Sequence, residues 1–113
     1  MKLTQIVLPL AVAALAGFST QTMAAVDADA AQALFKKNDC SKCHAVDKSK
    51  KGPALKKIAA KYKGKAEGQA NIIKNITSGA KVKLDDGSEE EHKIIDTKDQ
   101  AALKNLADWV LAQ

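Results

Sequence analysis

The 113-residue chain is poor in several residue types, and each shortage excludes a class of protein. Aromatic residues make up 4% of the chain, and it contains two cysteines, two histidines and no arginine. Two cysteines cannot form a framework of several disulfides. The lack of arginine and of aromatic residues that could stack on bases argues against nucleic acid as a partner. The apolar run at residues 6–17, interrupted by Pro9, is shorter than the roughly 20 residues that span a bilayer.

The first residues instead have the layout of a secretory signal peptide. Lys2 gives a positive start, the apolar run follows, and small residues stand at the third and first positions before an expected cleavage after Ala24. Cleavage after Ala25 is the alternative. We therefore expect residues 1–24 to be removed and residues 25–113 to form a single domain in a bacterial periplasm, with no membrane span after processing.

The sequence Cys40-Ser41-Lys42-Cys43-His44 has the form of a covalent haem attachment site. Two thiols three positions apart can form thioethers to the two vinyl groups of one haem. The histidine that follows is then held under the iron as an axial ligand. The motif therefore predicts one covalently bound haem c.

Three other interpretations use the same residues. A thioredoxin-like redox pair needs a βαβ context, and the sequence has no convincing strand pattern. The two cysteines with His44 and His92 add up to the four ligands of a structural zinc site, but the adjacent Cys43 and His44 make poor simultaneous ligands. A simple surface disulfide would leave His44 without a purpose.

Apolar residues recur at helical spacing along the rest of the chain, which predicts an all-α domain. The first expected helix begins after Asp27 or Asp29, and the second has Pro53 in its first turn. The third stops near Gly79. The last runs from a capping box at Thr97-Lys98-Asp99-Gln100 to the C-terminus. Residues 80–96 show neither helical nor strand periodicity, so we expect a loop there.

Four segments carry a resemblance to a known family: Leu34-Phe35, the motif at residues 40–44, Gly52-Pro53-Ala54, and the C-terminal residues 106–111. On these residues the chain from Ala28 to Gln113 resembles the small bacterial class I cytochromes c, soluble periplasmic carriers that serve oxidases and reductases. The resemblance implies a class I cytochrome c fold of three to five helices around one covalent haem, and a one-electron carrier rather than an enzyme.

The resemblance also implies two contacts. The first and last helices of this fold cross, with Phe35 and Trp109 meeting at the crossing. The carbonyl of Pro53 accepts a hydrogen bond from the ring of His44, a contact that fixes the ring and raises the basicity of the ligand.

The chain departs from the family at the second axial ligand, which is normally a methionine of the late loop. Its only methionines are Met1 and Met23, both within the expected signal peptide. The second histidine of the chain, His92, stands in the late loop, and imidazole suits iron. We therefore expect His92 to be the distal ligand. Lys83, Lys93 and an open iron site are the alternatives.

Methionine ligation raises the potential of a haem, and imidazole is the stronger donor, so two histidines predict a low-potential carrier. Two alternative functions remain open. One is a haem with an open or labile distal site that binds nitric oxide, carbon monoxide or peroxide, although the absence of arginine argues against a peroxidase. The other is the cytochrome subunit of a periplasmic dehydrogenase.

The chain has a formal net charge of +5, and all of its positive side chains are lysines. Eight of them fall between Lys48 and Lys65, whereas acidic residues crowd the late loop. Such a separation steers encounter with an acidic surface of a redox partner protein, although a lysine-rich face that only aids solubility explains the pattern equally well. We expect the protein to be a monomer.

Overall fold

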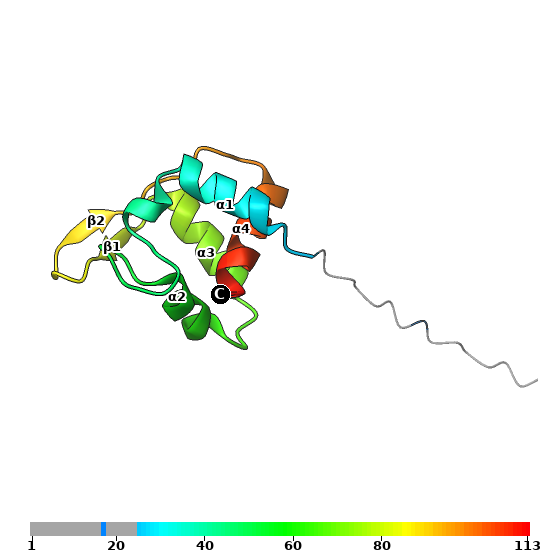
Figure 1. Ribbon diagram of the computed structural model, residues 1–113, viewed down its shortest axis with the longest axis horizontal. Helices are drawn as coiled ribbons and strands as arrows, with labels where there is room; N and C mark the ends of the chain where they lie inside the picture. The colour runs from blue at the N-terminus through cyan, green and yellow to red at the C-terminus, as the bar shows by residue number, and fades with distance from the viewer. Residues whose placement is uncertain (1–16, 18–24) are drawn as a thin grey trace, which may run out of the picture.

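The computed structural model describes Gly17 and residues 25–113 (Figure 1). The rest of the expected signal peptide lies outside the described residues. The described chain forms α1 (Ala28–Lys37), a short 3-10 helix η1 (Cys40–Lys42), α2 (Leu55–Tyr62), α3 (Gly68–Ser78), the strands β1 (Lys81–Lys83) and β2 (Glu89–Glu91), and α4 (Gln100–Leu111). Among these described elements, none is a helix long and apolar enough to cross a membrane.

Helices α1 and α4 lie across one another, as expected (Figure 1). The rings of Phe35 and Trp109 meet edge to face, with their centroids 5.6 Å apart and their planes at 63°. Such a pair contributes about 0.5–1.5 kcal/mol beyond the burial of its area. Near the start of α1, Asn105 exchanges two hydrogen bonds of 2.8 Å with the backbone of Asp27. The crossing is therefore fixed by an aromatic contact and a polar contact.

Helix α4 supplies most of the apolar core, and α1, α2 and α3 all pack against it. Its apolar stripe is buried because residues at helical spacing share one face. The buried residues of α4 are Leu103, Leu106, Ala107, Trp109 and Val110. Leu55 at the start of α2 and Ile72 in α3 complete the contact from the other helices. The prediction of a helical domain is confirmed.

The start of α1 and the end of α3 follow the sequence closely, whereas the start of α2 does not. The side chain of Asp27 caps α1 by accepting a 3.0 Å hydrogen bond from the backbone N–H of Ala30. Gly79 ends α3 in a left-handed conformation with φ of 65°, which glycine adopts at little cost. The prediction that Pro53 lies in the first turn of α2 is wrong, because the helix begins at Leu55 with Ala54 as its N-cap residue.

The predicted capping box at the start of α4 is also wrong. The N-cap residue is Asp99, whose carboxylate accepts from the backbone N–H groups of Ala101 and Ala102. The hydroxyl of Thr97 accepts instead from the backbone N–H of Asp99, at 3.2 Å. The carboxylate reaches two unpaired donors of the first turn, so the helix begins one residue after it.

The segment predicted as a loop, residues 80–96, contains an antiparallel hairpin. Strand β1 pairs with β2, with Lys81 opposite Glu91 and Lys83 opposite Glu89. Opposite charges at facing positions stabilise such a pair by about 0.2–1 kcal/mol each. Gly87, with φ of 86°, allows the connecting turn to close. The prediction of a loop is wrong for the residues of these two strands. The hairpin projects from the helical body (Figure 1).

Candidate functional site

The two cysteines lie in the tight turn between α1 and α2. The backbone N–H groups of Cys43 and His44 both donate to the carbonyl of Cys40, at 3.2 and 3.0 Å. Both thiols are free and half-buried. Burial raises the pKa of the Cys40 thiol above its ordinary value, which keeps it protonated at neutral pH. The turn therefore presents Cys40, Cys43 and His44 close together.

The ring of His44 is held by the segment that leads into α2. Its Nδ1 donates a hydrogen bond to the carbonyl of Pro53 at 2.7 Å. The neighbouring Gly52 lies so close that a Cβ there would be 2.7 Å from Cε1 of His44, so the close approach requires glycine. Burial lowers the pKa of His44, although the Pro53 carbonyl opposes this effect. The neutral ring is favoured, with the lone pair on Nε2.

His92 lies immediately after β2, at the base of the hairpin. Its backbone N–H donates to the carbonyl of Ala80 at 2.8 Å, which continues the pairing of the two strands. Its ring is half-buried, and Nδ1 contacts the carbonyl of Lys93 at 2.9 Å. A carbonyl only accepts, so Nδ1 carries a proton, and Nε2 is the nitrogen that can offer a lone pair to a metal ion. His92 therefore has the same tautomer as His44.

The two histidines come together although they are distant in the sequence. Their ring centroids lie 6.2 Å apart, and their planes are inclined by 34°. Two imidazoles that share one metal ion have centroids about 6 Å apart, the sum of two metal–nitrogen bonds of about 2.0–2.1 Å and the distances from each nitrogen to its ring centre. The separation of the two rings matches that spacing, and the free thiols of Cys40 and Cys43 lie in the turn that precedes His44.

The two lysines considered as alternative ligands are an exposed residue of β1 and a residue in an ion pair. Lys83 is exposed on β1. The amino group of Lys93 lies 3.4 Å from the carboxylate of Asp39. The pKa of Asp39 is lowered, mainly by Lys42 and further by Lys93. The ammonium of Lys93 is therefore held in an ion pair with Asp39.

The zinc alternative can also be compared with the geometry. Within residues 25–113, no group of three or more histidine, cysteine, aspartate or glutamate side chains is arranged so that it could hold a metal ion. The four residues weighed as zinc ligands, Cys40, Cys43, His44 and His92, thus do not form a four-ligand cluster.

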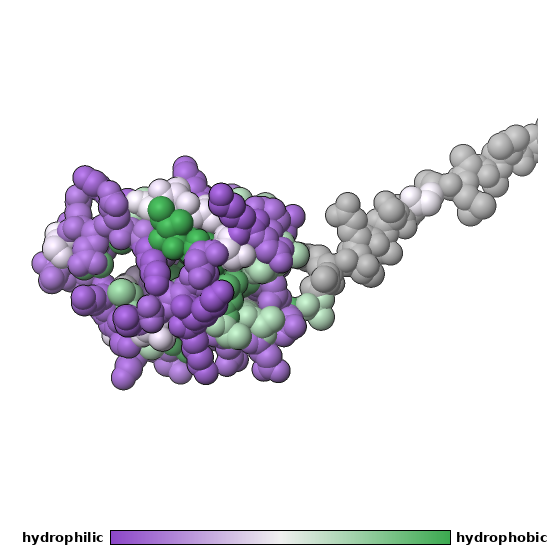
Figure 2. Space-filling view, turned by 90° about the horizontal axis from the view of Figure 1, so that it is seen from above, coloured by the Kyte–Doolittle hydropathy of each residue, from purple (hydrophilic) through white to green (hydrophobic). Residues whose placement is uncertain are grey.

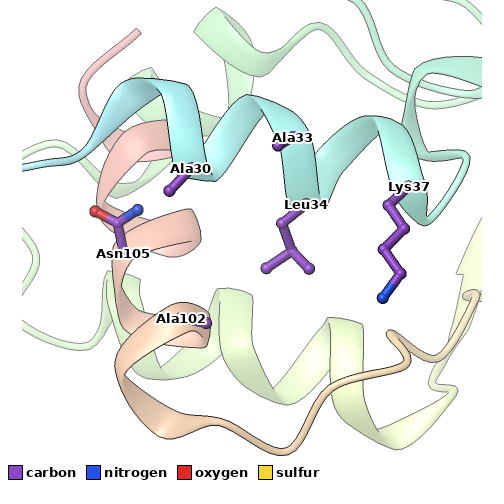
Figure 3. A pocket seen from close by; sticks show the side chains of 6 residues that line it. All are labelled: Ala30, Ala33, Leu34, Lys37, Ala102 and Asn105. Atoms are coloured by element: carbon purple, nitrogen blue, oxygen red, sulfur yellow. The ribbon is translucent and has the colours of Figure 1, made fainter.

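An apolar groove lies elsewhere, between α1 and α4 (Figure 3). Its volume is about 380 Å³, with Asn105 near one end and Lys37 near the other, and Leu34 pointing between the helices. Its remaining lining residues are Ala30, Ala33 and Ala102. The cysteines and histidines do not line it, so the groove is separate from the candidate site.

Two residues at the site were not identified from the sequence. Gly52 belongs to a segment that resembles the family, but its closeness to the His44 ring appears only in the fold. Asn38 is buried, with 2% of its surface exposed, and joins α1 to the segment after His92. A signal for Asn38 was present, because it follows Ala31, Leu34 and Phe35 on the apolar stripe of the first helix, where an amide must find partners.

The family of the chain follows from a comparison with known proteins. The model of the family described as cytochrome c matches residues 28–112. The chain belongs to the cytochrome c family.

Several named cytochromes resemble this one. It is 34% identical over 82 residues to cytochrome c-551 of Pseudomonas aeruginosa, covering 73% of this chain and 75% of that protein. It is 39% identical over 88 residues to cytochrome c-552 of Nitrosomonas europaea, covering 78% of this chain and 79% of that protein. The crystal structure of the class 1 cytochrome MtoD from Sideroxydans lithotrophicus ES-1 superposes with a TM-score of 0.74 at 55% identity, covering 78% of this chain and 97% of that one.

The cofactor of the protein follows from its membership of this family. The cytochrome carries one covalently bound haem c, and its relatives are named as cytochromes c. Its two cysteines, Cys40 and Cys43, have the spacing of a haem c attachment motif. The fold is that of the class I cytochromes, with a small two-stranded sheet added to the helices.

Proposed function

We propose that this cytochrome is a periplasmic one-electron carrier of low potential, exported by a signal peptide at residues 1–24. In this proposal Cys40 and Cys43 hold the haem through thioethers, and His44 and His92 are its two axial ligands. The haem supplies the one-electron redox chemistry. The chain supplies the ligands, their orientation and the surface that a redox partner contacts.

The matched tautomers of the two histidines carry this proposal. In each ring Nδ1 donates to a backbone carbonyl, Pro53 for His44 and Lys93 for His92. Each ring therefore directs the lone pair of Nε2 away from its backbone anchor. A metal-binding histidine is usually oriented by a hydrogen bond of this kind. With the ring centroids 6.2 Å apart, this arrangement supports ligation by both histidines over an open distal site.

Two properties of the site support a low potential. Imidazole replaces the methionine that raises the potential in other cytochromes c. The hairpin beside His92 carries exposed acidic residues that favour the more positive ferric state, namely Asp85, Asp86, Glu89, Glu90 and Glu91. Salt weakens the contribution of these exposed charges, so the ligand is expected to be the larger of the two effects.

Optical and paramagnetic resonance spectra of the purified protein test the proposal directly. We expect a low-spin, six-coordinate spectrum in both oxidation states, because both axial positions are filled by strong-field imidazoles. The weak far-red band that sulfur ligation gives ferric haem is expected to be absent. A high-spin spectrum would contradict ligation by His92 and favour an open site for small ligands. A far-red sulfur band would contradict the bis-histidine assignment.

The proposal includes docking of an acidic partner on the lysines between Lys48 and Lys65. Those of α2 and the turn after it are exposed. Figure 2 views the molecule from above, on the side of α1, and hydrophilic side chains also cover most of that face. Lys56 is paired with Asp47, so its reversal would also disturb that contact. Lys57 and Lys63 have no ion pair among the described residues and make better probes.

Reversing Lys57 and Lys63 to Glu is expected to slow electron transfer to an acidic partner about tenfold or more at low salt, because electrostatic steering raises association rates by about 10–1000-fold. The rate of the unchanged protein is expected to fall steeply with added salt. Stopped-flow kinetics measure both effects, and the visible spectrum is expected to stay the same. Reversing Lys98 and Lys104 to Glu makes the same change in net charge elsewhere. Equal slowing by the two pairs would show that net charge, not this face, controls the encounter.

A further inference from the structure

Asn38 is the only polar residue among the buried residues that the structure describes, with 2% of its surface exposed. It ends α1 as the C-cap residue and stands two positions before Cys40. Buried amides need hydrogen-bond partners, because an unpaired buried polar group is costly. The partners of Asn38 therefore indicate what this residue holds together.

The side chain of Asn38 bonds at both ends of its amide. Nδ2 donates to the carbonyl of Leu34 at 3.0 Å, and the same carbonyl accepts from the backbone N–H of Asn38 at 3.2 Å. Oδ1 accepts from the backbone N–H of Asp96 at 3.0 Å. One amide thus joins the helix that leads into the haem motif to the segment that follows His92.

Two ion pairs flank this amide. Lys37 lies 3.6 Å from Asp96, and Asp39 lies 3.4 Å from Lys93. The four side chains are more than half exposed, and exposed ion pairs contribute little to stability. We call these two pairs and the Asn38 amide the α1–loop junction. Its buried hydrogen bond, rather than its ion pairs, is the contact expected to hold the two segments together.

The α1–loop junction lies on the C-terminal side of His92. Hydrogen bonds on both sides of His92 hold this residue in place. Before the ring, the N–H of His92 itself bonds to Ala80. After the ring, the N–H of Ile95 donates to the carbonyl of Ile76 at 2.8 Å, and the N–H of Asp96 donates to Asn38. Of these three hydrogen bonds, only the last connects the distal loop to the end of α1, where the exposed Lys37–Asp96 ion pair makes the same connection.

We propose that Asn38 is a positioning residue that keeps His92 over the haem and so makes the distal ligand slow to leave. This inference rests on the proposed ligation by His92. It follows from the placement of one buried amide between the attachment turn and the distal loop. Asn38 does not touch the ligand itself; it acts by fixing the segment that begins at Lys93.

Asn38→Ala is the test. We expect carbon monoxide to bind the ferrous variant about tenfold faster or more, because the Asp96 N–H loses its buried partner and the loop opens more often. Uptake is measured by flash or stopped-flow spectroscopy under native conditions, where the release of His92 limits the rate. The covalent haem is retained, so its content is expected to stay the same.

Two variants separate positioning from general stability. Asn38→Asp keeps an oxygen that accepts from the Asp96 N–H, but its carboxylate repels the carbonyl of Leu34. We expect this variant to unfold more easily. Its rate of carbon monoxide uptake is expected to stay near that of the unchanged protein. Gln69→Ala removes the 2.8 Å hydrogen bond between Gln69 and Asp108, which joins α3 to α4, and is expected to leave uptake unchanged. Uptake that simply tracks denaturant stability across the three variants would overturn the inference.

Hydrogen exchange on the unchanged protein provides a measurement that needs no variant. The exchange rate of the Asp96 amide hydrogen is expected to be no higher than the rate at which His92 is released, as measured by carbon monoxide uptake. Both events break the contact between Asp96 and Asn38. Faster exchange would overturn the positioning role, as would equal uptake in the unchanged protein and Asn38→Ala. An unchanged protein that is high-spin and takes up carbon monoxide at once contradicts the proposed ligation by His92 instead.

Discussion

Replacing Cys40 and Cys43 together by Ala is expected to release the haem from the chain completely. The two thiols are the only ones in the sequence, and each forms one thioether in the proposed site. Acid-acetone extraction of the expressed protein, followed by spectroscopy of both phases, measures the loss. We expect all haem in the organic phase for the double variant and none for the unchanged protein. An unchanged protein whose haem is extracted would contradict thioether attachment at these cysteines.

The same variant is expected to lose most of its helical order. The buried core of the described residues is small and contains few large side chains, among which Leu55 and Leu103 are the largest that are fully buried. A domain of this size often needs a metal, a cofactor or disulfides to stabilise it. Far-ultraviolet circular dichroism measures the loss. Replacing the exposed Ser41 and Lys42 by Ala changes the same turn without touching a thiol, and this control is expected to keep both haem and helices.

The helices could be predicted from the sequence because each carries its own apolar stripe. The stripe of Leu103, Leu106 and Val110 in α4 recurs at 3.6-residue spacing, so its burial needs no knowledge of the partner helices. The attachment motif is equally local, since five adjacent residues define it. The crossing of Phe35 with Trp109 was different. It followed from the resemblance to the family, because nothing local to either residue identifies the other.

The features that were missed depend on pairing between distant residues. Each strand of the hairpin has only three residues, and β1 has a single apolar residue, Val82, between two lysines. The attraction between Lys81 and Glu91 becomes visible only when the strands are aligned. Asn38 was visible on an apolar stripe, but its partner lies 58 positions away. Short-range periodicity carries no information about contacts of this kind.

The proposed ligation itself combines both kinds of information. The loss of methionine from residues 25–113 and the presence of a second histidine are facts of composition. The 6.2 Å separation of the His44 and His92 rings is a fact of the fold, produced by the hairpin base before His92 and the α1–loop junction after it. Neither fact alone favours ligation over an exposed loop histidine. Together they support a specific spectroscopic result.

His92→Ala is expected to convert the low-spin protein to high-spin iron that binds carbon monoxide rapidly. Removing a strong imidazole donor destabilises the ferric state, so the reduction potential is expected to rise by about 0.1 V, a modest part of the roughly 0.8 V that axial ligands span. Optical spectra, carbon monoxide titration and voltammetry measure the three effects. Added imidazole is expected to restore the low-spin spectrum, because it can occupy the position that the side chain has left.

Glu91→Ala is the matched control for this variant, because Glu91 is the neighbouring residue at the end of β2 and its side chain is exposed. It alters the hairpin and removes one acidic charge but leaves the imidazole in place, so its spectrum is expected to stay low-spin. Lys83→Ala and Lys93→Ala test the remaining candidate ligands in the same way. If His92→Ala keeps a low-spin spectrum and one of the lysine variants loses it, the lysine is the distal ligand and His92 is a loop residue. If only His92→Ala becomes high-spin and recovers with imidazole, the distal position belongs to His92.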